Sequence, residues 1–345
     1  MSFSRILVRA TNWVGDAVMS LPAIRAVRAR FPDAYIAVLA RPWVAGLYAR
    51  ETSINQVFPY HVRPGFRDFT GKLRVARELR GQNFDCAILL QNAFEAAALA
   101  WLARIPTRIG YARDGRGPLL TNAIPLPKAG EIPRHQRYYY LELLRRANLT
   151  ETLPEIEAIR LDGADAAARE GARQFENRGI PAPVIGVSPG AAYGNAKRWL
   201  PERFAEAALE IARPLGIPIV LFGSAGEREL CESVAGLIQP SGRAVHNLAG
   251  ATTLAEFIDL AAACRLFLTN DSGAMHIASA LGVPTIAIFG STDEHATGPT
   301  GPLSRIIREP VECSPCLLRE CPIDHRCMER IPAGRVVRAS LELLG

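Results

Sequence analysis

The sequence predicts an α/β protein built from two doubly wound, Rossmann-like domains that face each other across a cleft. In both halves of the chain, apolar runs of strand length alternate with helical patterns. This alternation favours a parallel sheet with helices on both of its faces. A length of 345 residues is also enough for two separate cores. We expect the domains to span residues 1–160 and 161–330, and a closing helix within 331–345 to pack back on the first domain.

Apolar residues mark the individual elements of the first domain. After the strand at residues 5–9, Val18, Leu21 and Ile24 recur with helical spacing. The expected strands of this domain are 5–9, 35–39 and 86–90, and its expected helices are 17–30, 70–80, 94–104 and 136–147. A connection over residues 149–165 then leads to the second domain.

The second domain repeats the alternation. Its expected strands are 184–187, 217–222, 266–269 and 283–289, and its expected helices are 202–213, 227–238 and 254–264, with the closing helix at 334–344. Several of these strands end in turns of Gly and Ser. Because the carboxyl ends of parallel strands share one edge of the sheet, where ligands bind, the turns predict a ligand site at that edge.

The charge of the chain is unevenly distributed. The formal net charge is +6, but residues 1–150 contain 22 Lys and Arg against 10 Asp and Glu. A basic half is typical of proteins that bind nucleic acid, an anionic membrane surface or an acidic substrate, and it is also compatible with a solvated basic face that binds nothing. No aromatic-interleaved RNA-binding motif accompanies these arginines. We therefore favour an acidic, membrane-associated acceptor over nucleic acid.

The apolar segments are too short to cross a bilayer, because none approaches the ~20 residues that a membrane-spanning helix needs. The N-terminal apolar run at residues 5–9 is flanked by Arg and lacks the features of a secretory signal. We therefore expect the protein in the cytoplasm.

Asp16 follows a Gly turn after the first strand, at the start of a predicted helix. A carboxylate in this position has a structural explanation, because it can cap the helix or interact with its dipole. The functional alternative is a general base that takes a proton from an attacking hydroxyl. A dinucleotide-binding turn would need G-x-G-x-x-G, and residues 10–17 contain a single Gly, which argues against an NAD or FAD enzyme.

Two turns of the second domain suit a phosphate group. The first follows Ser188 and continues to Lys197 and Arg198 at the entry to a helix. These three side chains could hold a diphosphate by charge-assisted hydrogen bonds, although a solvated basic loop is the structural alternative. A second turn of this kind in the same predicted domain favours the phosphate interpretation.

The second turn reads Asn-Asp-Ser-Gly-Ala-Met-His at residues 270–276. Asp271 or Ser272 would cap the following helix, whose first N–H groups can face an anion. Gly273 would let a ligand approach the backbone. His276 lies one turn into the helix, where a histidine is either a packed core residue or part of this site.

Four cysteines are concentrated near the C-terminus. Cys313, Cys316, Cys321 and Cys327 have the spacing C-x2-C-x4-C-x5-C, with His325 between them. This pattern is compatible with a structural zinc site, a pair of disulfides or a redox-sensitive loop. Disulfides are disfavoured in a reducing cytoplasm, and the spacing differs from that of the usual zinc ribbon.

Taken together, the motifs resemble those of the bacterial lipopolysaccharide heptosyltransferases of glycosyltransferase family 9, most closely the heptosyltransferase II branch. The resemblance rests on Asn-Trp-Val-Gly-Asp-Ala at 12–17, Ser-Pro-Gly-Ala at 188–191, Ala-Lys-Arg-Trp at 196–199, Thr-Asn-Asp-Ser-Gly-Ala-Met-His at 269–276 and the cysteine segment. It covers nearly the whole chain.

The resemblance implies a GT-B architecture, with the acceptor bound mainly by the first domain and the nucleotide sugar by the second. It also implies inverting, metal-independent transfer of L-glycero-D-manno-heptose from ADP-heptose to the inner-core heptose of a lipid A–Kdo–heptose acceptor. No cofactor would be required, and the enzyme would lie at the anionic inner leaflet of the inner membrane without binding nucleic acid.

The resemblance and the motifs assign the site residues. Asp16 would be the base. Some relatives have an acidic residue that contacts the nucleotide ribose, but Glu227 does not align with it in the sequence, so ribose recognition stays unassigned. The expected donor-site residues are Ser188, Lys197, Arg198, Asp271, Ser272, Gly273 and His276, and the expected acceptor-side residues are Asn12, Trp13, Arg63, Arg67, Arg113 and Arg116.

Two other classes of protein share these motifs. One is another sugar-nucleotide enzyme on the same scaffold, such as a heptosyltransferase I or III, a different glycosyltransferase or a UDP-sugar epimerase. The other is a non-catalytic protein that binds a nucleotide sugar and does not need Asp16.

Overall fold

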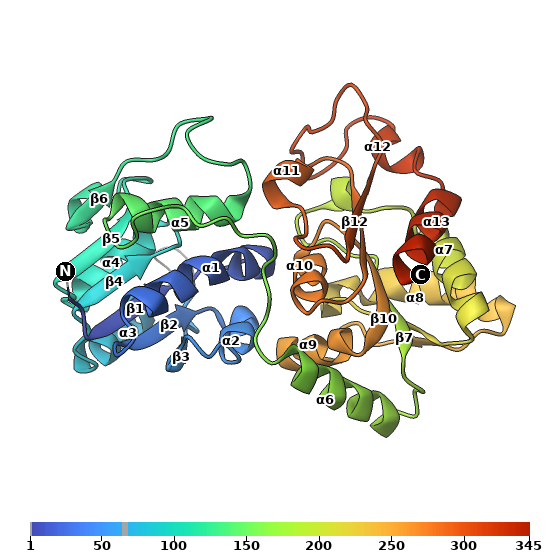
Figure 1. Cartoon of the computed structure of the whole chain (residues 1–345), viewed down its shortest axis with the longest axis horizontal. Coiled ribbons are helices and arrows are strands. Elements are labelled where there is room, and N and C mark those ends of the chain that lie inside the picture. Colours follow the sequence, from blue (N-terminus) through green and yellow to red (C-terminus); the bar gives the residue numbers. More distant parts are fainter. Residues whose placement is uncertain (1, 64–67) are drawn as a thin grey trace. The chain divides into compact units, whose positions relative to one another are not determined.

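The computed structural model describes residues 2–63 and 68–345, and it divides into two compact units, residues up to Ile156 and residues Glu157–Gly345 (Figure 1). Each unit is built around one six-stranded parallel sheet. The division falls inside the connection expected at residues 149–165. The predicted α/β class, with two doubly wound sheets, is confirmed.

The first unit has the strand order β3-β2-β1-β4-β5-β6. Its elements are β1 (Arg5–Arg9), α1 (Val14–Arg30), β2 (Tyr35–Ala40), α2 (Pro42–Tyr48), β3 (Gln56–Pro59), α3 (Phe69–Gly81), β4 (Cys86–Leu89), α4 (Phe94–Leu102), β5 (Thr107–Tyr111), the 3-10 turn η1 (Gly117–Leu119), β6 (Asn122–Ile124) and α5 (Gln136–Arg146).

The second unit repeats this arrangement with the order β12-β11-β10-β7-β8-β9. Its elements are α6 (Ala164–Asn177), β7 (Val184–Ser188), η2 (Asn195–Lys197), α7 (Pro201–Leu215), β8 (Ile219–Leu221), η3 (Ala225–Glu227), α8 (Arg228–Ile238), η4 (Gln239–Ser241), β9 (Val245–Asn247), α9 (Leu254–Ala262), β10 (Cys264–Asn270), α10 (Gly273–Ala280), β11 (Thr285–Phe289), α11 (Glu294–Thr297), β12 (Ser304–Arg308), α12 (Arg326–Glu329) and α13 (Ala333–Leu344).

Both sheets reverse their strand order beside their first strand. In the first sheet, two strands follow on one side of β1, and then three on its other side, beginning with β4. In the second sheet, two strands follow on one side of β7, and then three on its other side, beginning with β10. The register aligns Arg9 with Leu89 and Ser188 with Thr269 at the carboxyl ends of these pairs. Connections leave in opposite directions at such a switch point, so each sheet has room for a ligand there.

The central strands form because continuous runs of Val, Ile and Leu can be buried on both faces of a parallel sheet. Strands β4, β7 and β11 are buried at every position. By contrast, the short strands β3, β6 and β9 are partly exposed, and their sequences lack a continuous apolar run. The sequence patterns do not predict these three strands, β5, β12, or helices α2 and α6.

The closing helix α13 packs within the second unit. It contacts α7 and the strands β11 and β12, and it buries Val336 and Val337 in the core of that unit. These contacts use the amphipathic face of α13 within its own unit, where the core continues over β11 and β12. Packing of this helix on the first domain stays a prediction.

Among the helices in residues 2–63 and 68–345, none combines enough length with enough apolar character to span a membrane.

Helices α6 and α9 pack closely because α6 has no side chain at the contact point. A Cβ atom added at Gly171 would lie 1.9 Å from the backbone oxygen of Asp259 on α9. Gly236 on α8 is also helical, but a Cβ atom there would meet nothing within 4 Å. Substitution of the two glycines by alanine therefore distinguishes the effect of helix packing on stability from the effect of helix propensity.

We expect Gly171→Ala to lower the free energy of unfolding of the second unit by about 1–3 kcal/mol, because the added methyl group forces the helices apart. The matched change Gly236→Ala should raise it by about 0.5–1 kcal/mol through helix propensity. Urea unfolding followed by circular dichroism measures both changes. Equal effects of the two substitutions would contradict the close approach of α6 and α9.

Candidate active site

Asp16 lies at the switch point of the first sheet. It occupies the first turn of α1, whose N-cap is Trp13 and has no side-chain capping bond. The Tyr140 hydroxyl on α5 donates to Asp16 Oδ1 at 2.9 Å. Burial, and then the charge of Asp16, raise the pKa of Tyr140 well above its ordinary value. Tyr140 therefore remains a donor and fixes the orientation of a partly exposed carboxylate.

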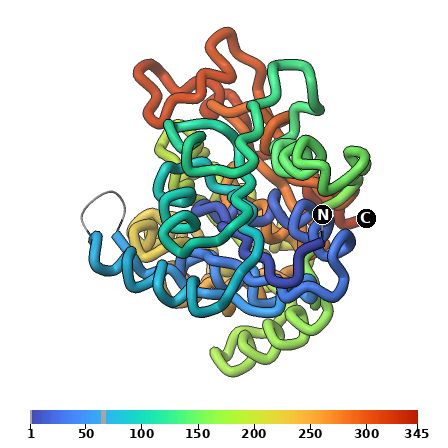
Figure 2. Tube along the Cα trace, turned by 90° about the vertical axis from the view of Figure 1, so that its left-hand side faces the viewer, coloured from blue at the N-terminus to red at the C-terminus, as the bar shows by residue number. Residues whose placement is uncertain are grey.

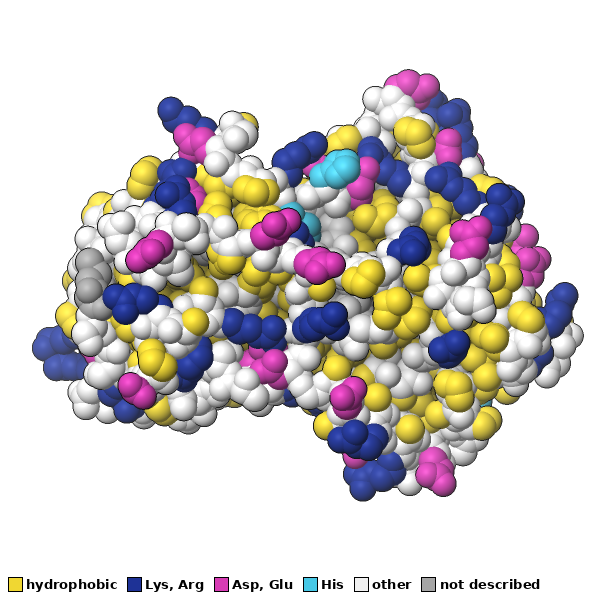
Figure 3. All heavy atoms as spheres, in the orientation of Figure 1, with side chains coloured by type: hydrophobic (Ala, Val, Ile, Leu, Met, Phe, Trp, Pro, Cys, Tyr) yellow, Lys and Arg dark blue, Asp and Glu magenta, His cyan; other side chains and the backbone are white. Residues whose placement is uncertain are grey.

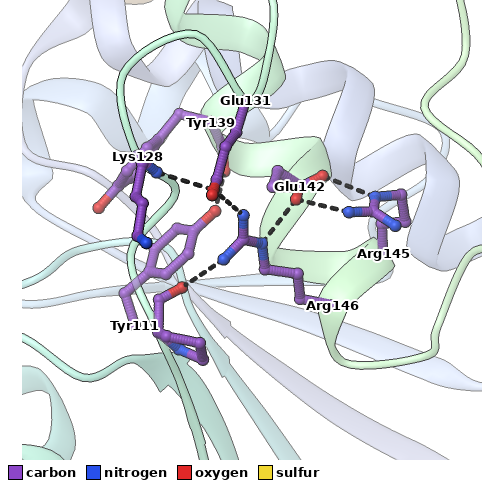
Figure 4. A network of polar contacts seen from close by, with 8 residues as sticks. Tyr111, Lys128, Glu131, Tyr139, Glu142, Arg145 and Arg146 are labelled. Atoms are coloured by element: carbon purple, nitrogen blue, oxygen red, sulfur yellow. Dashed lines mark hydrogen bonds and ion pairs between the residues drawn. The ribbon is translucent and has the colours of Figure 1, made fainter.

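Helix α5, which carries Tyr140, is anchored by an ionic network around Glu142 (Figure 4). Glu142 is buried and accepts from Arg145 Nε at 2.7 Å and from Arg146 Nε at 2.6 Å. Arg146 also pairs with Glu131 at 2.6 Å. Hydrogen bonding from Arg145, and further bonding from Arg146, lower the pKa of Glu142 against the effect of burial. Glu142 is thus a buried anion that orients Arg145 and Arg146 of its own helix, and Arg146 in turn connects α5 to Glu131.

A cluster of buried cations lies along the same edge of the first sheet. Arg9 ends β1, Arg41 follows β2, and Lys72 lies in α3. Glu95 accepts from Lys72 Nζ at 2.9 Å, from Arg41 Nη2 at 3.4 Å and from the Tyr60 hydroxyl at 2.7 Å. Burial, and then the charge of Arg41, lower the pKa of Arg9 to about 10.

This cluster carries an excess of positive charge. Three cations face one carboxylate, and the guanidinium groups of Arg9 and Arg41 lie over the Tyr60 ring, 5.2 and 4.4 Å from its centroid. The Nε atoms of both arginines are buried without a hydrogen-bond partner among the described residues. An excess of buried positive charge favours a nearby anion. Sequence reasoning missed the cluster because its members are separated by up to 86 positions.

The predicted acceptor-side residues have different environments. Asn12 accepts from Arg9 Nη2 at 3.2 Å, so it belongs to this edge, and Trp13 beside it is half exposed. Arg63 and Arg113 are exposed, and Arg113 lies 3.4 Å from Asp114. Arg67 lies outside the described residues.

Arg116 differs from the other predicted acceptor-side residues because it is completely buried. It donates to the carbonyls of Tyr111 and Gln91 and to Asn92 Oδ1. Burial lowers its pKa to about 10. In this structure Arg116 braces the loops after β4 and β5, and an acceptor contact would need it to leave these partners.

The side-chain amide of Asn270 lies at the switch point of the second sheet. Asn270 ends β10 and is completely buried. Its side-chain nitrogen donates to Pro189 O at 2.8 Å, and its oxygen accepts from Trp199 N at 3.0 Å. Asn270 therefore joins the turn after β7 to the entry of α7, and it holds both predicted phosphate turns in one place.

Lys197 and Asp271 form a short ion pair beside this amide. The distance from Lys197 Nζ to Asp271 Oδ2 is 2.5 Å, and Asp271 is 4% exposed. The Thr292 hydroxyl, which follows β11, donates to the same oxygen at 2.6 Å. The structure thus brings together one residue from each of three loops.

The start of α10 adds backbone donors to this group. Ser272 is the N-cap residue but makes no side-chain cap bond to the helix; its hydroxyl lies 3.2 Å from that of Thr269. The first N–H groups of the helix, from Gly273 onward, thus lack a side-chain cap, and such groups bind anions. His276 is buried one turn further on.

Two further predicted donor-site residues flank these turns. Ser188 ends β7 and is buried. Arg198 donates to Ala191 O at 3.4 Å, while its Nε is buried without a partner among the described residues. Both lie at the carboxyl edge, as expected from the sequence.

Glu227 lies beside the turn that follows β7. A Cβ atom added at Gly190 would lie 2.1 Å from Glu227 Oε1. The carboxylate also accepts from the Ser224 N–H and hydroxyl, both at 2.8 Å. Although it is off register in the sequence, Glu227 therefore reaches the same edge of the sheet through the 3-10 turn η3.

The cysteine segment does not form the metal site or the disulfides that were considered. All four cysteines are free, so a disulfide pairing is wrong for this structure. In the part of the chain that the structure describes, no three His, Cys, Asp or Glu residues are grouped to hold a metal ion, and a structural zinc is not supported. Burial, and then the neighbouring thiols, raise the pKa of Cys327 to about 11.

The backbone of this segment instead supports the loop that carries Lys197. Ala196 N donates to Arg319 O at 3.0 Å, and His325 Nε2 lies 3.2 Å from Ala196 O. The Tyr193 hydroxyl donates to Leu317 O at 2.8 Å. A Cβ atom at Gly194 would lie 2.1 Å from Arg319 O. The segment therefore packs directly against the Lys197 turn.

The chain is similar to known glycosyltransferases over most of its length. Residues 72–326 match the family described as glycosyltransferase family 9 (heptosyltransferase). The chain is 33% identical over 312 residues to lipopolysaccharide heptosyltransferase 2 of Salmonella typhimurium, covering 88% of each chain. It is also 33% identical over 310 residues to the Escherichia coli protein of that name, with the same coverage.

A solved structure shows the same fold along the whole chain. The structure of E. coli ADP-heptose LPS heptosyltransferase II superposes with a TM-score of 0.81 at 31% identity, covering 99% of this chain and 98% of the other. An E. coli heptosyltransferase with bound ADP has a TM-score of 0.72 at 19% identity, which supports the fold alone. The GT-B architecture implied by the sequence motifs is confirmed.

We expect Glu142→Gln to lower the free energy of unfolding at pH 7 by about 1–3 kcal/mol, because two charged hydrogen bonds to a buried group are weakened. The lowered pKa of Glu142 means that the ionised form stabilises the fold above the unfolded pKa of about 4.3. This contribution is lost as the pH falls through the lower folded pKa. Thermal unfolding between pH 3 and 7 should therefore show the two proteins converging in acid.

The exposed residue Glu78 provides the control for this measurement. Glu78→Gln should change the free energy of unfolding by less than about 0.5 kcal/mol at every pH. A constant difference between wild type and Glu142→Gln across the pH range would show that Glu142 does not act through its charge.

Proposed function

This chain belongs to glycosyltransferase family 9, and we propose that it transfers L-glycero-D-manno-heptose from ADP-heptose to the inner-core heptose of a lipopolysaccharide acceptor. The observation that carries the proposal is the Lys197–Asp271 pair beside the uncapped start of α10, at the switch point of the second sheet. This arrangement suits a nucleoside diphosphate, and the relatives at 33% identity are named for the heptose transfer.

The second unit would bind the donor. Negative charge grows on the leaving diphosphate as the bond to the sugar breaks, and the Lys197 ammonium group and the first N–H groups of α10 can stabilise it. Asp271 and Thr292 hold Lys197 in place before the donor binds. Ser188, Arg198 and His276 would line the same site.

Glu227 is the carboxylate best placed to accept hydrogen bonds from the hydroxyls of a donor ribose. Its oxygen lies against the Gly190 turn, at the edge where the nucleotide would bind. Both Ser224 contacts are made to Oε2, and they fix the orientation of the carboxylate.

The first unit would bind the acceptor and supply the base. Asp16, oriented by Tyr140, would remove the proton from the acceptor hydroxyl, which then attacks the anomeric carbon on the face opposite ADP and inverts it. General-base catalysis of this kind contributes roughly 10²–10⁴-fold. Asn12, Trp13, Arg63, Arg67 and Arg113 would contact the acceptor together with the cationic cluster of Arg9, Arg41 and Lys72.

In this proposal, Lys197 and backbone amides stabilise the negative charge of the diphosphate, and no divalent cation is needed. It also assigns the protein to the cytoplasm, at the anionic surface of the inner membrane, since its acceptor would be attached to lipid. The excess of basic residues in residues 1–150 supports that location.

Incubation with ADP-heptose and a lipid A–Kdo–heptose acceptor, followed by mass spectrometry, tests the proposal. We expect one heptose to be added and ADP released, at a rate that EDTA does not alter. Transfer from a UDP-sugar instead, epimerisation of a UDP-sugar, or binding of ADP-heptose without turnover would each overturn it.

We expect Asp16→Asn to lower turnover by at least about 100-fold, because the amide cannot accept the proton. Affinity for ADP-heptose, measured by calorimetry, should change less than twofold. Asp33→Asn, a change at an exposed carboxylate of the same unit, should leave both quantities unchanged. Near-normal turnover of the Asp16 variant would remove this residue from the role of base.

We expect Lys197→Met to weaken ADP binding by at least about tenfold, since a charge-assisted hydrogen bond to a phosphate is lost. The single change also leaves Asp271 buried without its cation, which destabilises the fold. The double variant Lys197→Met/Asp271→Asn removes that effect and should recover the melting temperature without recovering ADP affinity. Recovery of both would show that Lys197 only stabilises the fold.

A further inference from the structure

A basic groove lies on the first unit, away from the proposed active site. It has a volume of about 600 Å³ and lies between α3 and α4, which are side by side and face the viewer in Figure 2. Arg77 and Arg80 come from the second half of α3, Arg104 follows α4, and Arg108 lies in β5. The ends of these helices and the start of β5 belong to the amino edge of the sheet, opposite the edge of Asp16.

The lining of the groove contains four arginines and no carboxylate. In the described parts of the chain, the side chains of Arg77, Arg80 and Arg104 have no hydrogen-bond or ion-pair partner, while the Arg108 side chain donates to Leu119 O at 2.7 Å. On the face drawn in Figure 3, by contrast, basic side chains are scattered among acidic ones. Arginines near helix C-termini are common, but four around one hollow create a local positive potential that attracts anions.

The groove also has an apolar component. Trp101, on α4, is 52% exposed at its wall, and Leu73 and Leu102 contribute to its lining. An exposed Trp beside apolar side chains and arginines is typical of surfaces that sit at the boundary of lipid and water. Nucleic acid would gain little from a single Trp, because single strands bind to successive aromatic rings.

We propose that this groove docks the first unit on a membrane surface by binding the phosphate headgroups of anionic phospholipids. Arg77, Arg80 and Arg104 would bind phosphate oxygens, for which the planar guanidinium group is suited. Trp101 would insert at headgroup level. The inference concerns the binding of anionic lipid by the first unit, and it rests on the residues of the groove and not on the transfer reaction.

Flotation of the full chain with lipid vesicles tests this docking surface. The protein should bind vesicles of phosphatidylglycerol and phosphatidylcholine, but not vesicles of phosphatidylcholine alone, and 0.5 M NaCl should release it. Arg77→Glu/Arg80→Glu should lower the partition coefficient at least about tenfold, given the usual contribution of each basic residue near a charged bilayer. Because both side chains are exposed and unpaired in the described residues, the variant should keep the wild-type melting temperature.

The matched control lies on α6, where a groove is lined by Arg169, Arg173 and Glu176. Arg173 is already paired with Glu170 at 2.7 Å. Arg169→Glu/Arg173→Glu makes the same change of net charge and should alter partitioning less than about twofold, because the charge-dependent attraction is local. An equal loss in both variants would show that net charge alone binds the membrane, and it would overturn the proposal.

Two further readouts separate the proposal from its alternatives. Tryptophan emission should shift to shorter wavelength on anionic vesicles in wild type, and this shift should be reduced in Trp101→Phe. Glycerol 1-phosphate at millimolar concentration should not displace the protein from vesicles. Displacement by that soluble phosphate, tighter binding of an RNA oligonucleotide at the same arginines, or unchanged partitioning of Arg77→Glu/Arg80→Glu would each overturn docking on lipid.

The rate of heptose transfer to a soluble, delipidated acceptor distinguishes the failure of one proposal from the failure of the other. The Arg77→Glu/Arg80→Glu variant should have wild-type rates with that acceptor, since neither residue touches the active site. Loss of transfer in wild type would contradict the proposed function and leave the flotation result intact.

Discussion

The ion pair between Lys197 and Asp271 holds together three loops of the second unit that come from distant parts of the chain. Asp271 is buried, and removing its cation would leave a charge inside the protein, so the positions of β10, η2 and the turn after β11 depend on one another. The same pair keeps an ammonium group oriented before any ligand arrives. Such preorganisation is what an electrostatic site needs, because little reorganisation is then required when charge develops.

In both units a carboxylate is held in position by neighbouring side chains, but these side chains differ between the units. In the first, a tyrosine from α5 orients Asp16, and Arg146 of the same helix pairs with Glu131 outside it. In the second, a lysine and a threonine orient Asp271. Both carboxylates lie where the strand order reverses, because only there do the connecting loops separate enough to leave polar groups accessible.

Much of the fold, and a smaller part of the site, could be predicted from the sequence. Strands such as β4 and β11 are buried throughout and almost entirely apolar because both faces are covered, whereas β6 and β9 are short and partly exposed and leave no comparable pattern. The turns at Ser188 and Asp271 were predictable because each directly follows a buried strand. The Tyr140–Asp16 bond joins residues 124 positions apart, and no local spacing could indicate it.

The contact between Gly194 and the carbonyl of Arg319 has a consequence for how this part of the molecule can diverge. Here main chain meets main chain, so the path of the cysteine segment helps to set the shape of the neighbouring turn. Cysteines could be exchanged for other small residues over evolutionary time at modest cost. A deletion or insertion between 313 and 325 would shift the backbone itself, and the diphosphate-binding lysine would move with it.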